Sequence, residues 1–477
     1  MSRPSKKLSR RSMFKAGAVA AAGALPYSAS AQSNEDPQLA RAKAARRLLL
    51  RGGIVLTLDS QIGDFTRADV LIEDGKIREV RPDIQDSAES VEIIDATNRI
   101  VTPGFIDTHS HSYQGLLRGF LPNGVVYPDY DRDIQNNITA HYTPSDAYAG
   151  VLVTALAMLD MGTTGVVDIS QVAHTPEHSD ANIEALKEAG IRAVFAYSRG
   201  IGAGAKYPGD LARMKTRYFA SDDQLLTPAL AVSTDPKVFA VAREFGVRAV
   251  MHIRLNSEPL LALFRAGLMK PGDEYVHCTH LNAEAWRAIR ESGGLTSHSP
   301  PLEMAMGHGF PSIQDALDNG MRPSLSCDHA ATTGMDMFGM MRATFNLQRL
   351  GIQQRQRNGE QKVPPLLTCR EALEFATIEG ARCAALDHRT GTLTPGKDAD
   401  ILMLRYDDLD IWPLNNAWSA VVNLMHPGHV ENVFVAGKVR KWRGALVDVD
   451  RARTLRLVAE ARDAVVRKSG LPMNLLG

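Results

Sequence analysis

The sequence predicts an eight-stranded α/β barrel joined to a small β-sandwich built from both ends of the chain. Through the middle of the chain, short apolar runs alternate with stretches of helical periodicity, which is typical of parallel strands joined by crossover helices. Eight such runs lie between Phe105 and Asp328, the number that closes a TIM or (β/α)8 barrel. The stretches on either side of this middle alternate with a period of two, which predicts the sandwich.

The predicted barrel strands are short apolar runs. They cover residues 105–111, 164–168, 191–197, 228–233, 247–252, 275–277, 295–299 and 323–328. Helical periodicity between them is clearest over residues 182–189, 236–245 and 283–291. The rival fold is an open doubly wound sheet, which would carry a glycine-rich phosphate loop after its first strand. His109-Ser110-His111 stands at that place instead, and this favours the barrel.

The composite sandwich is predicted from residues 46–100 together with residues 390–450. In the first part, strands are expected over 54–58 and 68–72, and Glu73-Asp74-Gly75-Lys76 predicts a hairpin turn. In the second part, strands are expected over 400–404, over 430–435 and from Val439 onward. The barrel then takes residues 101–389, and residues 451–477 are left as a C-terminal helix and tail.

The first 31 residues are predicted to be an export signal that is not part of the fold. Six basic residues and no acidic ones precede a short apolar stretch over 16–25, and Ala29-Ser30-Ala31 provides a small-residue cleavage site. Ser9-Arg10-Arg11-Ser12-Met13-Phe14-Lys15 resembles the twin-arginine signal. We therefore expect the mature protein in the periplasm or secreted; a disordered basic tail is the alternative.

Composition restricts the kind of partner. The chain is 44% hydrophobic and 23% charged with a formal net charge of zero, which is ordinary for a globular protein. There is no basic run beyond the N-terminus, which argues against nucleic acid. No later apolar stretch reaches about 18 residues, so we expect no integral membrane segment in the mature protein. The four cysteines are widely spaced and are expected to be buried free thiols: Cys278, Cys327, Cys369 and Cys383.

Metal-binding residue types stand at the ends of the predicted barrel strands. His109 and His111 close the first strand, and side chains at positions i and i+2 of a strand project from the same face. His252 closes the fifth strand, His277 the sixth and Asp328 the eighth. Because the carboxyl ends of the strands carry the active site of such barrels, these side chains predict one metal centre there.

Three sequence motifs resemble those of the amidohydrolase superfamily. The run Pro103-Gly104-Phe105-Ile106-Asp107-Thr108-His109-Ser110-His111 resembles its opening motif. Val276-His277-Cys278-Thr279-His280-Leu281 resembles its sixth-strand motif, and Ser326-Cys327-Asp328 its eighth-strand segment. The branch of the superfamily that is most similar holds triazine hydrolases and cytosine- or guanine-type deaminases.

The resemblance implies a mononuclear centre. His109, His111, His252 and Asp328 would bind the metal, and His277 would lie beside it, hydrogen-bonded to substrate or water. Branches with two metals use a carboxylated lysine at the end of the fourth strand, and residues 228–233 contain no lysine. Three imidazoles and a carboxylate suit one divalent ion, zinc first and iron as the alternative.

The fifth strand departs from the family pattern. Deaminases of this branch carry His-x-x-Glu there, and the glutamate transfers protons to the heterocycle. Here Leu255 occupies the position of the glutamate. Glu258 and Glu303 are the candidates to replace it, and simple ring deamination is therefore one option among several.

The predicted chemistry is hydrolysis of a carbon–nitrogen bond, other than a peptide bond, by a metal-bound hydroxide. Asp328 would accept the proton of the attacking water and pass it to the leaving group, while His277 would polarise the bond under attack. The substrate would be a small cyclic or aromatic compound, and the reaction would be deamination or amide hydrolysis. Candidate substrate contacts lie in loops after the strands: Gln114, His280, Glu303 and His308.

Two alternatives remain open from the sequence. The same centre could dehalogenate an N-heterocycle, or the barrel could be a non-catalytic periplasmic binding protein. In each case the partner is a small molecule, and a homodimer is expected because barrels of this type often form one.

Overall fold

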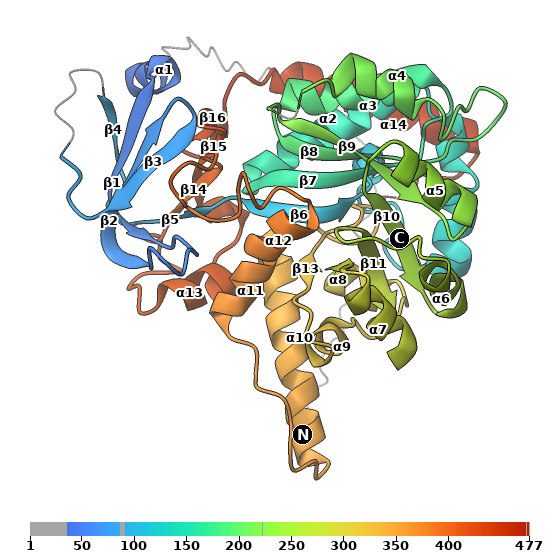
Figure 1. Ribbon diagram of the computed structural model, residues 1–477. Helices are drawn as coiled ribbons and strands as arrows, with labels where there is room; N and C mark the ends of the chain where they lie inside the picture. The colour runs from blue at the N-terminus through green and yellow to red at the C-terminus, as the bar shows by residue number, and fades with distance from the viewer. Residues whose placement is uncertain (1–35, 86–90, 222, 474, 477) are drawn as a thin grey trace, which may run out of the picture.

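The computed structural model describes residues 36–85, 91–221, 223–473 and 475–476. The predicted export signal, residues 1–31, lies outside the described residues. Two sheets organise the rest of the chain, a mostly antiparallel sheet and a barrel, which lie side by side (Figure 1).

The barrel contains eight parallel strands, each paired with its neighbours in the order of the chain. These strands are β6 (Phe105–Ser110), β7 (Thr163–Ser170), β8 (Arg192–Tyr197), β9 (Leu226–Val232), β10 (Ala249–Arg254), β11 (Glu274–Thr279), β12 (Leu295–His298) and β13 (Ser324–Leu325). Just after β13 the ring closes onto β6, because the Asp328 N–H donates to the carbonyl of His109 and the His111 N–H donates to that of Asp328. The predicted TIM barrel is confirmed.

The burial of the strands explains why the sequence predicts the barrel. Every residue of β6, β7, β8 and β11 is buried. A strand covered by helices outside and by side chains inside has no solvent-facing position, so its sequence is a continuous run rather than an alternation. All eight predicted runs correspond to strands.

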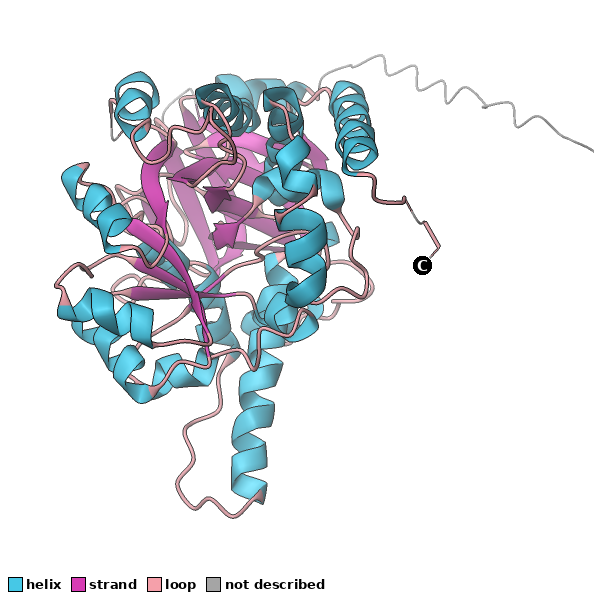
Figure 2. Ribbon diagram, turned by 90° about the vertical axis from the view of Figure 1, so that its right-hand side faces the viewer, coloured by secondary structure: helices cyan, strands magenta, loops and turns pink. Residues whose placement is uncertain are grey.

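Helices form the outer layer around the strands (Figure 2). They are α2 (Pro144–Asp160), α3 (Pro176–Ala189), α4 (Leu211–Tyr218), α5 (Pro236–Glu244), α6 (Glu258–Arg265), α7 (Ala283–Glu291), α8 (Pro300–Ala305), α9 (Ile313–Asp318), α10 (Met337–Arg357), α11 (Cys369–Ala376) and α12 (Ile378–Cys383). Local signals set their starts: Thr143 and Asp146 form a capping box on α2. The Asn282 side chain accepts from the Ala285 N–H at the start of α7. The far end of α10 projects from the body (Figure 1).

The second sheet is built from both ends of the chain, as predicted. Its strands are β1 (Arg47–Val55), β2 (Phe65–Glu73), β3 (Lys76–Arg81), β4 (Val91–Asp95), β5 (Arg99–Pro103), β14 (Ile401–Arg405), β15 (Val430–Val435), β16 (Lys438–Trp442) and β17 (Ala445–Leu446). The sheet divides at β1, whose first half pairs with β4 and whose end pairs with β5. The N-terminal and C-terminal contributions meet where β5 pairs with β14.

Two details of this sheet test the sequence prediction. The hairpin is confirmed: Glu73 pairs with Lys76, and the two residues between them, Asp74 and Gly75, have φ of 51° and 79°. The first strand lies earlier in the chain than the predicted range 54–58, since it begins at Arg47 and ends at Val55. Leu58 has φ of 57°, a left-handed conformation that ends extended structure.

A buried ion pair joins the two sheets. Arg192 at the start of β8 is completely buried and donates to both Asp398 and Asp400, which lead into β14. Short helices α1 (Pro37–Ala44) and α13 (Ala417–Ser419) accompany the sandwich, and the C-terminal helix α14 (Arg451–Ser469) packs against α2.

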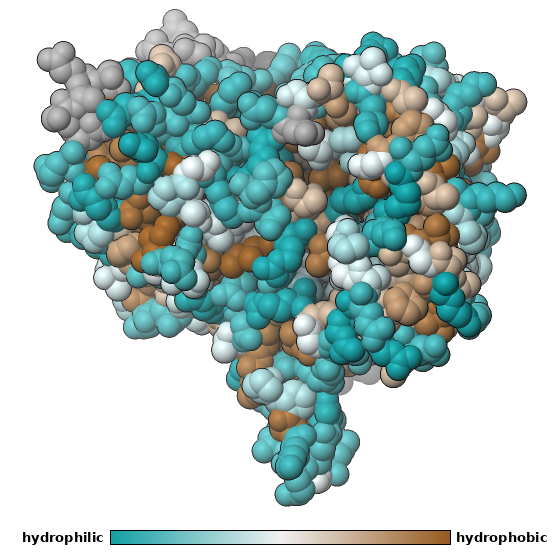
Figure 3. All heavy atoms as spheres, in the orientation of Figure 1, coloured by the Kyte–Doolittle hydropathy of each residue, from teal (hydrophilic) through white to brown (hydrophobic). Residues whose placement is uncertain are grey.

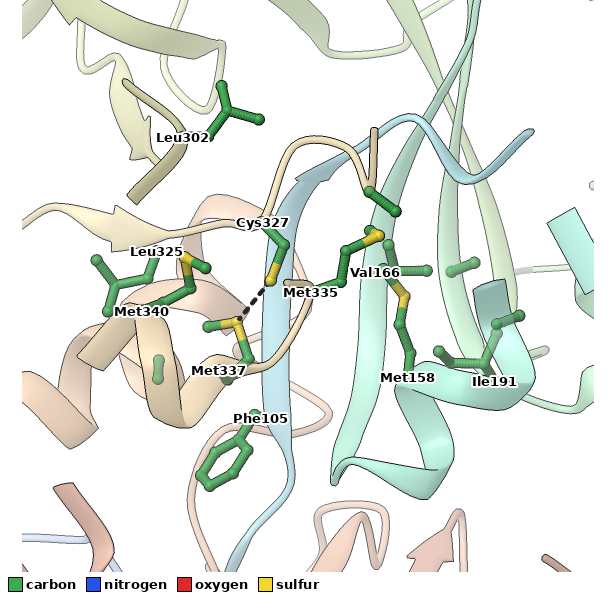
Figure 4. Close-up of a cluster of buried hydrophobic side chains, with 14 of the residues drawn as sticks. Phe105, Met158, Val166, Ile191, Leu302, Leu325, Cys327, Met335, Met337 and Met340 are labelled. Atoms are coloured by element: carbon green, nitrogen blue, oxygen red, sulfur yellow. Dashed lines mark hydrogen bonds between the residues drawn. The ribbon is translucent and has the colours of Figure 1, made fainter. Parts of the chain in front are cut away.

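An apolar, sulfur-rich cluster supports the end of the eighth strand (Figure 4). Cys327 Sγ lies 3.8 Å from Met337 Sδ, and the Phe105 ring meets Phe338 edge-on at 5.1 Å. Because Cys327 immediately precedes Asp328, this packing holds the aspartate in place. Buried free thiols are confirmed for Cys278, Cys327 and Cys383; Cys369 is half-buried.

The outer surface is hydrophilic over most of the face drawn in Figure 3, with apolar side chains scattered between. Among the described helices, none combines the length and apolarity that crossing a bilayer requires.

Candidate active site

Four histidines and one aspartate converge at the carboxyl ends of the barrel strands. The ring centroids of His109 and His111 are 4.8 Å apart, and those of His109 and His252 are 4.6 Å apart. Asp328 Oδ1 lies 3.5 Å from Nε2 of both His109 and His111, and Asp328 Oδ2 lies 3.5 Å from Nε2 of His277. The structure therefore brings together all five residues that the sequence predicted.

The donor atoms suit a cation. One ligand atom from each of His109, His111 and His252 lies within 4.8 Å of the others, and the same holds for His109, His277 and Asp328. Both ring nitrogens of His109 are buried and lack a hydrogen-bond partner among the described residues. Buried polar atoms are normally satisfied, so unpartnered imidazole nitrogens at the centre of such a cluster fit a metal ion.

Burial favours the neutral, metal-binding form of His111 and His252. At His109 burial is outweighed by the Asp328 carboxylate, which raises the pKa of that imidazole. Desolvation, with repulsion from His109, lowers the pKa of His111 to about 3, and it lowers the pKa of His252 well below its usual value. Burial alone would raise the pKa of Asp328, but His109 and His329 nearby hold it well below its usual range. The centre thus presents lone pairs and one negative charge.

A neighbouring strand orients His111. Its Nδ1 lies 3.1 Å from the carbonyl oxygen of Ile169 on β7. A carbonyl can only accept, so Nδ1 carries the proton and Nε2 keeps its lone pair toward Asp328.

Glu303 lies behind His277, away from the open site. Its Oε1 is 3.0 Å from His277 Nδ1 and accepts the Ser299 N–H at 2.9 Å. The residue is completely buried, and this burial raises the pKa of Glu303 to about 8. Its Oε2 has no hydrogen-bond partner among the described residues.

Two residues of the site have a left-handed backbone conformation. His277 has φ of 70° and Asp328 has φ of 64°, left-handed values that residues other than glycine rarely adopt. Each residue lies at the carboxyl end of its strand region, where the turn aims its side chain at the centre. Strain of this kind is typical of functional positions.

A cavity of about 650 Å³ opens onto the centre. Imidazoles of His111, His252 and His277 and the carboxylate of Asp328 form its floor. Its walls come mainly from the loops after the strands: Val126, Tyr127, Tyr130, Asp131, Gln135, Asn136, Thr139, Ala140, Gln171, Arg199, Gly200, Ile201, Arg254, His308 and His329. Its size suits a small molecule.

The four predicted substrate contacts are placed differently. His308 lines the cavity, and its ring lies 4.6 Å from that of His277. Gln114 is buried below the cavity, where its amide donates to Tyr113 Oη and Tyr130 Oη. His280 is exposed and lies against Gly309, and Glu303 reaches the site only through His277.

The structure also locates the residues around the missing glutamate. Leu255 is 60% exposed and has φ of 65°, so this position does not face the centre. Glu258 is exposed and pairs with Arg265, which leaves it outside the cavity. Of the two candidates to replace the glutamate, only Glu303 connects to the centre.

Several cavity residues were not predicted as contacts, notably Arg254 and Tyr127, whereas His329, which stands next to Asp328 in the sequence, was expected as a further polar contact and does line the cavity. The His329 ring stacks on Tyr130 at 4.6 Å. For Arg254 the sequence did contain a signal: it lies two residues after His252 on the same strand, hence on the same face. Tyr127 had none, because it lies where the π-helical segment Val126–Gln135 departs from helical geometry, with φ of −126° and ψ of 126°.

A model of the amidohydrolase family matches residues 100–440 of the chain. The chain is 27% identical over 429 residues to a 5-methylthioadenosine/S-adenosylhomocysteine deaminase from Caldicellulosiruptor saccharolyticus, which covers 84% of this chain and 95% of that protein.

Solved structures share the fold. An adenosine deaminase from Xanthomonas campestris with bound zinc has a TM-score of 0.77 at 22% identity, covering 88% of this chain and 98% of that one. An atrazine chlorohydrolase from Arthrobacter aurescens, complexed with zinc, also has a TM-score of 0.77 at 22% identity, covering 87% of this chain and 100% of that one.

Proposed function

Since this chain belongs to the amidohydrolase family, we propose that it is a metal-dependent hydrolase that cleaves a carbon–nitrogen bond of a small cyclic or aromatic compound. One observation carries the proposal: His109, His111, His252 and Asp328 converge where a cavity of about 650 Å³ opens, and both ring nitrogens of His109 lack a hydrogen-bond partner among the described residues.

We propose that these four residues hold one divalent metal, zinc in the first place. The ligand chemistry supports zinc, and so does the zinc bound in the structures with the same fold. When bound, such an ion lowers the pKa of water and so supplies a nucleophile near neutral pH.

Residues of the chain then transfer the protons of the reaction. The two carboxylate oxygens of Asp328 face different partners, Oδ1 toward His109 and His111 and Oδ2 toward His277. Asp328 can therefore take a proton from the attacking water on one side and deliver it to the leaving nitrogen on the other. His277 lies beside Asp328 Oδ2, where it positions the group under attack next to that carboxylate.

The named relatives support deamination of a ring amine as the leading form of this reaction. Hydrolytic dehalogenation is the second candidate, because a structure with this fold is an atrazine chlorohydrolase. Both reactions replace a substituent of an electron-poor ring with hydroxyl, so the same floor of the cavity serves either one.

The test is a substrate screen on the full chain with measured metal content. The panel contains 5'-methylthioadenosine, S-adenosylhomocysteine, cytosine, guanine and atrazine, and the assay scores ammonia, amine and chloride release. Chelation should abolish turnover and added zinc should restore it. Asp328→Asn should lower kcat about 100- to 10,000-fold, the contribution of a positioned proton-transfer group.

The matched control is Asp463→Asn, which removes an exposed carboxylate of α14 paired with Arg462. It should leave kcat unchanged. Turnover that survives both chelation and Asp328→Asn would refute the proposed function.

We further propose that the protein is exported by the twin-arginine route. The support is the motif Ser9–Lys15 and the small-residue site Ala29-Ser30-Ala31. Replacing Arg10 and Arg11 with lysine should move the protein from the periplasmic or secreted fraction to the cytoplasm. An unchanged distribution would count against this route.

A homodimer is the assembly we propose for the mature protein, as expected for barrels of this type. Light scattering of the purified protein tests it, and a mass equal to a single chain would overturn it.

A further inference from the structure

Arg254 faces the cavity without a counter-charge. Arg254 lies on β10 two residues after His252, so both side chains project from the same face of the strand toward the barrel mouth. Its Nη2 donates to Tyr127 Oη at 3.0 Å, and its guanidinium lies 5.1 Å from the centroid of the Tyr127 ring. Its Nη1 is buried and has no hydrogen-bond partner among the described residues.

Arg254 is half-buried, and it differs from Arg192 and Arg99, whose guanidinium groups pair with carboxylates. Arg192 pairs with Asp398 and Asp400, and Arg99 pairs with Glu431. Arg254 forms no ion pair with any carboxylate in the described part of the chain. The head group is only partly withdrawn from water, but its buried Nη1 donor is left unpaired, which costs free energy.

The remaining charges of the cavity do not neutralise Arg254. Asp328 faces the histidines, and Asp131 on the wall accepts from the Asn136 amide at 3.0 Å. A second guanidinium, that of Arg199, also lines the cavity. With a divalent cation held by the floor, the cavity has an excess of positive charge.

We propose that Arg254 binds a carboxylate of the substrate, so that the protein acts on small acidic compounds. The inference rests on the proposed function and specifies its substrate class. A guanidinium presents parallel N–H donors that match the two oxygens of a carboxylate. The Tyr127 side chain keeps the Arg254 guanidinium in a fixed orientation. The reacting ring of the substrate then lies between Arg254 and the histidines that form the cavity floor.

The experiment measures binding rather than turnover. Benzoate and benzamide have the same shape and differ in charge, and each is titrated calorimetrically into the full chain. The titrations use the zinc-loaded protein and the chelated protein, because benzoate can also coordinate a metal directly. Variants are Arg254→Gln, Arg254→Lys and the control Arg287→Gln, which removes an exposed arginine of α7 that is outside the cavity.

We expect wild-type protein to prefer benzoate to benzamide with and without zinc. Arg254→Gln should raise the Kd of benzoate about 10- to 100-fold, the range for losing a charge-assisted hydrogen-bonded contact, and leave that of benzamide unchanged. Arg254→Lys should recover part of the affinity, and Arg287→Gln should behave as wild type.

Equal binding of benzoate to wild type and Arg254→Gln would overturn the inference, as would equal binding of benzoate and benzamide to wild type. A preference for benzoate that disappears on chelation would assign the anion to the metal and overturn it as well. These outcomes are independent of the hydrolysis assay. Failure of the substrate class is therefore distinguishable from failure of the proposed function, which the chelation and Asp328→Asn arms measure.

Discussion

At the scale of single residues, Glu303 is placed to control the proton on His277. Its Oε1 already accepts the Ser299 N–H, and it lies 3.0 Å from Nδ1 of His277. When Glu303 is a carboxylate it can only accept, so Nδ1 then carries the proton and Nε2 presents its lone pair toward Asp328. Glu303 acts through His277, so it is a positioning residue rather than a substitute for the family glutamate in contact with substrate.

Two substitutions at Glu303 should separate orientation from charge. Glu303→Gln keeps an acceptor oxygen, so we expect kcat at pH 7 within about 3-fold of wild type. Glu303→Leu removes the acceptor and should lower kcat about 10- to 100-fold, the usual cost of losing such a supporting contact. Metal content, measured alongside, should stay the same in both variants.

The pH profile adds a second readout for Glu303. Since burial raises the pKa of Glu303 to about 8, the carboxyl is protonated below that pH and becomes a carboxylate above it. When the Glu303 carboxylate accepts the hydrogen bond from Nδ1–H of His277, it raises the basicity of Nε2 on the same ring. Wild-type kcat should therefore rise as the pH passes through about 8. Glu303→Gln cannot ionise, and a rise that persists in this variant would contradict the assignment.

At the scale of elements, the turn after β6 depends on a close approach between helices. His111 leads directly into the 3-10 helix Ser112–Leu117, which packs on α2 at Gly150. A Cβ at Gly150 would lie 2.1 Å from the carbonyl oxygen of Tyr113, far inside van der Waals contact. Only glycine lets α2 lie this close and so hold the segment that follows the two metal-binding histidines.

We expect Gly150→Ala to lower the free energy of unfolding by about 1–3 kcal/mol, the range for overpacking a close contact. Urea unfolding of the zinc-loaded protein measures it, and the zinc affinity should fall as well because His111 is displaced. Gly209→Ala is the control, since a Cβ there would meet its nearest neighbour at an ordinary 3.6 Å. Equal unfolding midpoints for the two variants would count against this account.

At the scale of the whole molecule, a buried arginine and a metal centre each connect distant parts of the chain. Arg192 joins β8 to the segment that returns into the sandwich, and the metal centre joins the first, fifth and eighth strands of the barrel. Each holds charged groups in a buried place, so removal of one partner should leave an uncompensated buried charge and a large penalty.

Arg192→Met should lower the free energy of unfolding by about 3–5 kcal/mol, because it leaves Asp398 and Asp400 with less compensation in a buried place. Arg217→Met is the matched control. Its guanidinium is 58% exposed and pairs with Asp180, and exposed pairs contribute about 0–1 kcal/mol. Chemical denaturation of both variants checks the difference, and similar losses would show that burial of the pair is unimportant.

Removal of the metal should also destabilise the fold. A ligand present at about 1,000 times its Kd stabilises the native state by about 4 kcal/mol, so chelation should lower the melting temperature by several degrees. Differential scanning calorimetry with and without chelator measures the shift. In His109→Ala, which lacks a central ligand, the chelator should have little further effect; a full shift there would place the metal elsewhere.

Part of this molecule was predictable from local pattern. The eight barrel strands stand out because strands buried on both faces need uninterrupted apolar runs. The five residues of the centre stand out because a closed parallel barrel brings the carboxyl ends of its strands to one rim. The hairpin at Asp74-Gly75 is predictable for a local reason too, since two left-handed residues require such a pair.

Other features depended on contacts between parts of the chain that no local pattern connects. The cavity walls come mainly from the loops after the strands, so neither Tyr127 nor its contact with Arg254 could be inferred. The position of Glu303 behind His277, rather than against the substrate, follows from the turn after β12. The sequence by itself determined the barrel, the family and the five residues that converge at its rim, because these follow from buried apolar runs, family motifs and strand ends. Only the tertiary structure decided which side chains face the cavity and which support it from behind, because that depends on packing between loops far apart in the chain.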